Sequence, residues 1–187
     1  MKIKYLRTFI FFSASVIVAA CSSPSNSNQP TANHQTHDSH QMEVNERGDK
    51  AMGFSHEKTT HHFRLFADGG AIEVTANDSQ DATSRDQIDA HLSHIAQMFA
   101  AGNFDAPMLT HGKTPPGVPV LQKLKSEINY TYEQMENGGR VRITTKNPEA
   151  IAAVYEFLRF QISDHQTGDS LGIMRERKAI RLAYNIV

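Results

Sequence analysis

A duplicated hairpin pattern constrains the fold of this chain more than any other feature. Residues 68–75 (DGGAIEVT) align with residues 137–144 (NGGRVRIT) at a constant offset of 69 residues. The Asp-Gly and Asn-Gly pairs tolerate the positive φ of a tight turn, and the alternating apolar residues after them are typical of half-buried strands. Residues 63–65 and 128–132 alternate in the same way ahead of the turns. The pattern predicts two β-hairpins, although Gly-Gly turns are common enough for the alignment to arise by chance.

A helical pattern follows each hairpin. In the first helix Ser84 is placed to act as the N-cap and Gln87 to close a capping box, and Gly102 ends the pattern. In the second, Asn147 precedes a first-turn proline. The order ββα-ββα predicts an α+β fold with a four-stranded antiparallel sheet and two helices on one face. The apolar stripes of the two helices are Ile88, Leu92, Ile95 and Phe99, and Ile151, Val154, Leu158 and Ile162.

The segment between the two halves is rich in helix breakers. Residues 104–119 contain four prolines and two glycines, which predicts a long loop without regular structure. Val120 to Leu124 could add one short helical turn before the third strand. A long ordered loop is often functional, but a plain connector between two repeats explains it equally well.

The first 21 residues have the features of an export signal. Lys2, Lys4 and Arg7 precede an apolar run from Phe9 to Ala20, and Cys21, the single cysteine of the chain, follows small residues. The alternative is an uncleaved signal anchor, but the run is shorter than the roughly 20 residues needed to span a bilayer. The sequence therefore predicts a cleaved secretory signal.

The stretch Val18-Ala19-Ala20-Cys21 resembles the lipobox of bacterial lipoproteins. The resemblance implies that a diacylglycerol thioether forms on the Cys21 sulfur, that the chain is cut before Cys21, and that the new amino terminus is acylated, for example with palmitate. It also implies a lipid-anchored protein that faces the periplasm. Ser22, in place of aspartate, resembles lipoproteins that are sent to the outer membrane.

The composition divides the chain into four parts. Residues 1–20 are the predicted signal peptide, 21–51 a flexible tether rich in His, Ser and Asn, 52–168 the α+β domain, and 169–187 a basic C-terminal tail or an extra edge strand. Removing the signal with its three basic residues shifts the formal charge from −1 to −4. Such a chain lacks the basic face that nucleic acid binding needs, so the membrane, reached through the lipid anchor, is the one partner predicted.

Histidines are the main candidates for chemistry. The chain has ten of them and seven methionines. Neutral imidazole binds zinc and copper, and thioether sulfur favours Cu(I), so copper or zinc is the predicted cofactor. The candidate metal ligands are His56, His61, His62, His91 and His94 in the domain and, as weaker candidates, His34, His37 and His40 in the tether.

Each histidine group also has a purely structural explanation. The tether histidines could be polar linker residues. His61 and His62 point to opposite faces of a regular strand, so they cannot chelate one ion together. His91 falls within the apolar stripe of the first helix, which favours a core role. His165 extends the second stripe, where it could meet His91 or simply stabilise a helix C-terminus.

Catalytic motifs are missing. The sequence has no glycine-flanked serine elbow, no phosphate loop and no His-Glu-x-x-His, and Cys21 is not a free nucleophile once it is lipidated. We therefore predict no catalytic residues.

Segments of the body resemble a family of small exported bacterial proteins without an established activity. They include residues 58–63 (KTTHHF), 84–88 (SRDQI), 91–95 (HLSHI), 115–119 (PPGVP) and 157–160 (FLRF). Some similar proteins carry the name aspartate carbamoyltransferase, which the residues do not support. That enzyme needs two α/β domains and a Ser-Thr-Arg-Thr phosphate loop, whereas this chain has Thr83-Ser84-Arg85 and about half the length.

Two hypotheses follow. The first is an envelope lipoprotein that binds copper or zinc through histidines. The second is a metal-free interaction module, in which the tether lets a small domain reach a protein partner and the histidines serve the core and the helix ends.

Overall fold

The computed structural model describes residues 32–175, with side chains from residue 39 onward. The helices are α1 (Ala32–Met52), α2 (Ala82–Ala100), α3 (Asp105–His111), α4 (Val118–Lys123) and α5 (Pro148–Asp164), with short 3-10 turns η1 (His56–Lys58) and η2 (Lys125–Glu127). The strands are β1 (Thr59–Phe66), β2 (Gly69–Ala76), β3 (Ile128–Met135) and β4 (Gly138–Thr145).

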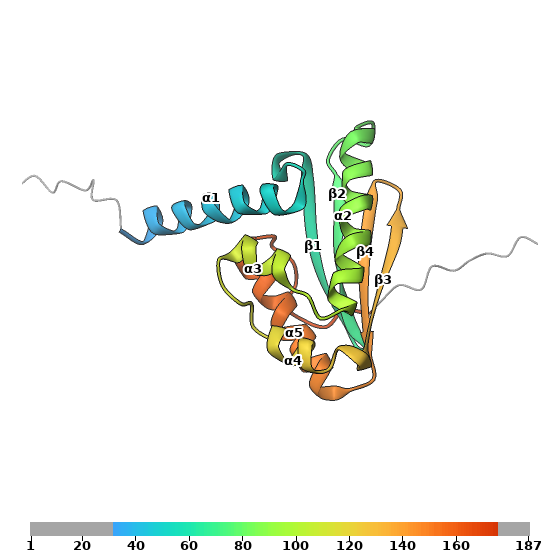
Figure 1. Ribbon diagram of the computed structural model, residues 1–187. Helices are drawn as coiled ribbons and strands as arrows, with labels where there is room; N and C mark the ends of the chain where they lie inside the picture. The colour runs from blue at the N-terminus through green and yellow to red at the C-terminus, as the bar shows by residue number, and fades with distance from the viewer. Residues whose placement is uncertain (1–31, 176–187) are drawn as a thin grey trace, which may run out of the picture. The chain divides into compact units, whose positions relative to one another are not determined.

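The four strands form one antiparallel sheet in the order β1-β2-β4-β3 (Figure 1). This confirms the predicted α+β fold with two hairpins. The hairpins meet along β2 and β4, where Gly69 pairs with Thr144 and Thr75 pairs with Gly138. Moving each residue of the first pair by the repeat offset of 69 gives the second pair, because Gly69 becomes Gly138 and Thr144 becomes Thr75. The sequence repeat is therefore a structural two-fold relation between the hairpins.

The glycines of the repeat serve a purpose that the sequence pattern did not suggest. The tight turns lie at residues 67–68 and 136–137, one position before each glycine. Gly69 and Gly138 have φ of 140° and 153°, and a Cβ on them would collide with the carbonyl oxygens of Ile143 and Val74. Glycine is thus required where the two central strands come closest together.

Helices α2 and α5 cover the same face of the sheet, the one that carries Phe63, Ile72 and Val141 (Figure 1). Each packs mainly on the other repeat's hairpin: α2 lies over β4 and β3, and α5 contacts β1 most. The predicted stripes face this core, with Ile151 half-buried and the other seven residues buried. Because each helix covers the other repeat's strands, the two repeats share a single core.

The start of α2 differs from the prediction. The N-cap is Asp81 rather than Ser84: the Ser84 backbone N–H donates to Asp81 Oδ1 (3.0 Å) and its hydroxyl to Oδ2 (2.8 Å). These bonds hold the pKa of Asp81 below its usual range. The helix begins one turn earlier because a carboxylate accepts both bonds. The predicted cap of the second helix is confirmed, with Asn147 Oδ1 accepting from the N–H of Glu149 (2.8 Å).

The predicted loop over residues 104–119 is wrong. It contains α3 and the start of α4. Pro107 lies in the first turn of α3, where a backbone N–H has no helical partner, so proline costs nothing there. Gly112, with φ of 65°, ends α3 in the left-handed conformation. The breakers therefore mark the ends of two short helices.

The predicted flexible tether over residues 21–51 differs from the structure over residues 32–51, which form most of α1 in the same compact unit as the sheet. The helix packs on α3. Val44, Gly48 and Ala51 form one stripe of small residues on it, in which Val44 and Gly48 are buried, Ala51 is half-buried and Gly48 lies near Thr110. Arg47 Nε also donates to the Thr110 carbonyl (3.0 Å). Because this stripe has little aliphatic bulk, the composition resembles that of a linker.

The segment after α5 runs along the outer edge of β1. Asp169 Oδ2 accepts from the Phe63 N–H (2.9 Å), and the Met174 N–H donates to the Leu65 carbonyl (2.7 Å), which makes a parallel bridge. Up to residue 175 the segment thus covers the sheet edge. The rest of the predicted tail, residues 176–187, lies outside the described residues.

The predicted signal peptide and Cys21 also lie outside the described residues. Within residues 32–175, none of the helices combines the length and apolar character that crossing a membrane requires.

Candidate functional site

A cavity of about 70 Å³ lies between the sheet and the helix layer. Its walls are largely apolar, and four imidazoles and one thioether face it: Met52 from the end of α1, His61 from β1, His91 from α2, His111 from α3 and His165 just after α5. The volume exceeds that needed for one water molecule. Among the described residues that line it there is no aspartate or glutamate.

His61 and Met52 meet in the cavity. The His61 Nε2–H donates a hydrogen bond to Met52 Sδ (3.2 Å), because a thioether sulfur can only accept. Strand alternation points His61 to the helix-covered face and His62 to the other, as predicted. The end of α1 brings the thioether to the same place, so one ligand atom comes from α1 and one from the sheet.

Aromatic contacts hold the imidazoles around this pair. The His61 ring lies parallel to that of His165, with centroids 5.9 Å apart and an interplanar angle of 3°. Phe54 is stacked with His61 at 6.1 Å and meets His91 edge-on at 5.5 Å. The ring nitrogens of His91 and His165 make no hydrogen bond within the described part of the chain. These two rings are therefore positioned by packing alone, with their nitrogen lone pairs uncommitted.

Burial keeps these imidazoles neutral. Burial, followed by the proximity of His91 and His62, lowers the pKa of His61 to about 4. Burial also lowers the pKa of His91 to about 4, with a smaller effect of His94. For His165, burial and then the neighbouring His111 and His61 lower the pKa to about 3. At neutral pH all three rings carry one proton, so each has one nitrogen able to bind a metal.

His111 has a supporting role instead. Its Nδ1 donates to Asp164 Oδ2 (2.6 Å), its Nε2 lies 2.8 Å from Gln161 Oε1, and its side chain is fully buried. Asp164 also accepts from His40 Nε2 (3.0 Å). Burial alone would raise the pKa of Asp164, but the bonds from His111 and His40 hold it below its usual range. Both nitrogens of His111 are therefore engaged, and the ring is part of the cavity wall.

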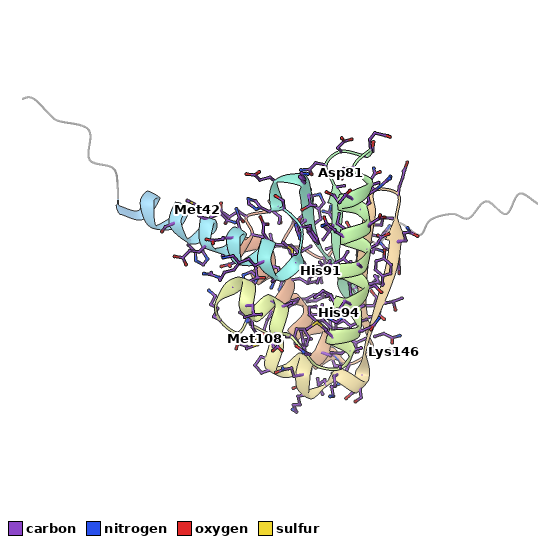
Figure 2. All side chains as sticks on the ribbon, turned by 45° about the horizontal axis from the view of Figure 1, so that its top comes forward. Met42, Asp81, His91, His94, Met108 and Lys146 are labelled. Carbon is purple, nitrogen blue, oxygen red and sulfur yellow. The ribbon has the colours of Figure 1, made fainter. Side chains whose placement is uncertain are left out.

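The structure brings only two of the predicted domain ligands, His61 and His91, to one site. His56 Nδ1 pairs with Asp49 (3.0 Å), and His62 Nδ1 pairs with Asp169 (2.9 Å). His94 is exposed. Figure 2 shows His94 and His91 on neighbouring turns of α2, and His91 lies closer to the end of α1. His40 binds Asp164, whereas the side chains of His34 and His37 lie outside the described residues.

No group of three or more His, Cys, Asp or Glu side chains in the described part is arranged to hold a metal ion. The five candidate ligands of the domain therefore do not gather at one place, because strand alternation and carboxylate partners separate them. Met52 and His165 were not among the predicted ligands. The position of His165 on the apolar stripe of α5 was a usable signal, while nothing in the sequence places Met52 against β1.

No family model, curated protein or solved structure significantly matches this chain. The predicted resemblances, to bacterial lipoproteins and to a family of small exported proteins, therefore stay predictions.

Proposed function

We propose that this protein is a lipid-anchored protein of the bacterial cell envelope and that its domain binds a transition metal, copper or zinc, in the histidine-lined cavity. The observation that carries the metal proposal is the 3.2 Å approach of His61 Nε2 to Met52 Sδ beside two further neutral imidazoles. Neutral imidazole nitrogen suits copper and zinc, and thioether sulfur suits copper as Cu(I).

The distance between the two donor atoms fits one ion with little movement. Metal–nitrogen and metal–sulfur bonds of about 2.0 and 2.3 Å at a tetrahedral angle separate the donors by about 3.5 Å. The observed 3.2 Å is close to this value. His91 and His165 line the same cavity and are the candidates for further ligands. Met52 and His61 are thus two donor side chains already in contact, and an ion that binds both replaces their hydrogen bond, with the ring proton on Nδ1 instead of Nε2.

Titration of Zn(II) and copper into residues 21–187, with Cys21→Ser to remove the thiol, tests the metal proposal. We expect one ion per chain with sub-micromolar affinity. His61→Gln and His91→Gln are expected to weaken binding by about tenfold or more, because each removes a nitrogen ligand. The matched controls His62→Gln and His94→Gln change neighbouring histidines that do not line the cavity, and are expected to bind as the parent chain does.

Two results would contradict the metal proposal. One is the absence of binding. The other is binding that survives His61→Gln and His91→Gln but is lost when His34, His37 and His40 are all changed to Gln. The first result would favour the metal-free interaction module. The second would place the metal at the histidines of residues 34–40 and leave the cavity histidines as packing residues.

The anchor is supported by the basic, apolar and small-residue order of the first 21 residues. Expression of the full chain in a Gram-negative host, followed by membrane fractionation and labelling with a palmitate analogue, tests it. We expect the parent to be labelled and membrane-bound, and Cys21→Ser to be unlabelled. A labelled Cys21→Ser protein would overturn the anchor.

A further inference from the structure

We infer that the cavity selects Cu(I) over divalent ions and that the bound ion joins α1 to the sheet through Met52 and His61. This inference rests on the proposed metal-binding function and specifies its ligand.

The donor set is soft and uncharged. The cavity offers a thioether and neutral imidazoles, and no carboxylate or thiolate among its described lining residues. Thioether sulfur favours Cu(I), whereas zinc sites are usually completed by four ligands that often include anionic groups. The nearest carboxylates of this region are committed elsewhere: Asp49 pairs with His56, and Asp164 with His111 and His40. Within the described lining, no carboxylate is therefore positioned to bind the ion directly and neutralise a dication.

The apolar walls of the cavity also favour Cu(I) over a divalent ion. Phe63, Ile72 and Phe157 face the cavity beside the donors. The cost of transferring an ion from water into such surroundings rises steeply with its charge, so a divalent ion without anionic ligands is penalised more than a monovalent one. Cu(I) is the ion that combines single charge with affinity for sulfur and imidazole.

The same ion would cross-link two elements. Met52 is the last residue of α1, and His61 lies in β1. The described contacts that hold α1 include one fully buried aliphatic side chain, Val44, and the bonds from Arg47 to Thr110 and from His40 to Asp164. A coordination bond at the end of the helix adds a second kind of link to this small contact. We therefore expect that an ion in the cavity slows the separation of α1 from the rest of the domain.

Matched methionine variants of residues 21–187 with Cys21→Ser test this inference. Cu(I) affinity is measured anaerobically by competition with a chromogenic Cu(I) chelator, and Zn(II) affinity with a fluorescent chelator. Met52→Leu keeps the apolar contact and removes the sulfur, so we expect Cu(I) affinity to fall by about tenfold or more while Zn(II) affinity stays within about threefold. Met42→Leu is the control, since Met42 lies on the same helix and its exposed fraction is 71%. It is expected to change neither affinity.

A second measurement does not depend on a folded variant. X-ray absorption of the Cu(I)-loaded parent is expected to show one sulfur neighbour at about 2.3 Å together with nitrogen neighbours. Hydrogen exchange of the parent is expected to show slower exchange of the last turns of α1 when Cu(I) is added, and Met52→Leu is expected to lose this effect.

The outcomes separate the inference from the function on which it rests. If neither ion binds, the proposed function fails and the inference falls with it. If both ions bind with similar affinity and Met52→Leu changes neither, or if Cu(I) has no sulfur neighbour, the inference is overturned while metal binding stands.

Discussion

Gly138 lies where a side chain cannot be accommodated. Its φ is 153°, and a Cβ there would collide with the Val74 carbonyl oxygen on the neighbouring central strand. We expect Gly138→Ala to lower the free energy of unfolding by at least about 2 kcal/mol, because it combines backbone strain with displacement of a neighbouring strand. Urea denaturation followed by circular dichroism measures the change. Gly69→Ala, at the equivalent position of the other repeat, is expected to have a similar effect.

Gly53→Ala separates the contribution of backbone strain from that of strand displacement. Gly53 also has positive φ, 79°, but a Cβ there would have no atom within 4 Å. Strain alone predicts a loss of about 1 kcal/mol. An equal loss for Gly138→Ala and Gly53→Ala would mean that the close approach of β2 and β4 does not require glycine.

At the scale of single elements, the cap of α5 provides a clean test. Asn147 Oδ1 accepts from the N–H groups of Glu149 and Ala150 (2.8 and 3.3 Å), and its Nδ2 donates to Glu127 (2.8 Å). We expect Asn147→Ala to lower the free energy of unfolding by about 1 kcal/mol, the usual cost of losing an N-cap. Lys146→Ala is the control, because Lys146 is an exposed neighbour outside the cap. A comparable loss in both variants would contradict the capping role.

Helix α1 shows how far element-level reasoning reaches. Pairs at helical spacing, Glu43 with Arg47 and Glu46 with Lys50, support the helix from its exposed side. Its buried side is made by Val44, Gly48 and Ala51, which carry too little apolar surface to form a recognisable stripe. What makes this segment part of the domain is the surface of α3, which is formed by residues far along the chain.

For the whole molecule, the buried imidazoles predict acid sensitivity in the metal-free protein. The folded-state pKa values of His61, His91 and His165 are about 4, 4 and 3, below the ordinary 6.5 that these groups regain on unfolding. At pH values between the folded-state pKa values and 6.5, the unfolded chain binds more protons than the folded chain does, so acidification favours unfolding. The part of the unfolding free energy that depends on these three histidines is thus fully present above about pH 6.5 and is lost progressively as the pH falls toward 4.

Melting temperatures of the metal-free chain between pH 7.5 and 4.5 check this prediction. We expect a decline below pH 6.5 that becomes shallower in His165→Phe, which removes one buried base and keeps an aromatic ring against His61. His94→Gln is the control: His94 is exposed and makes only the smaller contribution to the pKa of His91, so we expect a smaller change in slope than for His165→Phe. A profile that is flat from pH 7.5 to 4.5 would show that the cavity histidines are protonated in the folded state as readily as in the unfolded one.

The sequence by itself determined the duplicated ββα order, the apolar stripes of α2 and α5, and the opposite orientations of His61 and His62. These properties depend on periodicity and turn chemistry, which act over a few residues. Only the tertiary structure decided that each helix covers the other repeat's hairpin, that α1 belongs to the domain, and that Met52 meets His61. Those contacts join segments far apart in the chain, so no local pattern records them. The pairing of His56, His62 and His40 with carboxylates was hidden for the same reason.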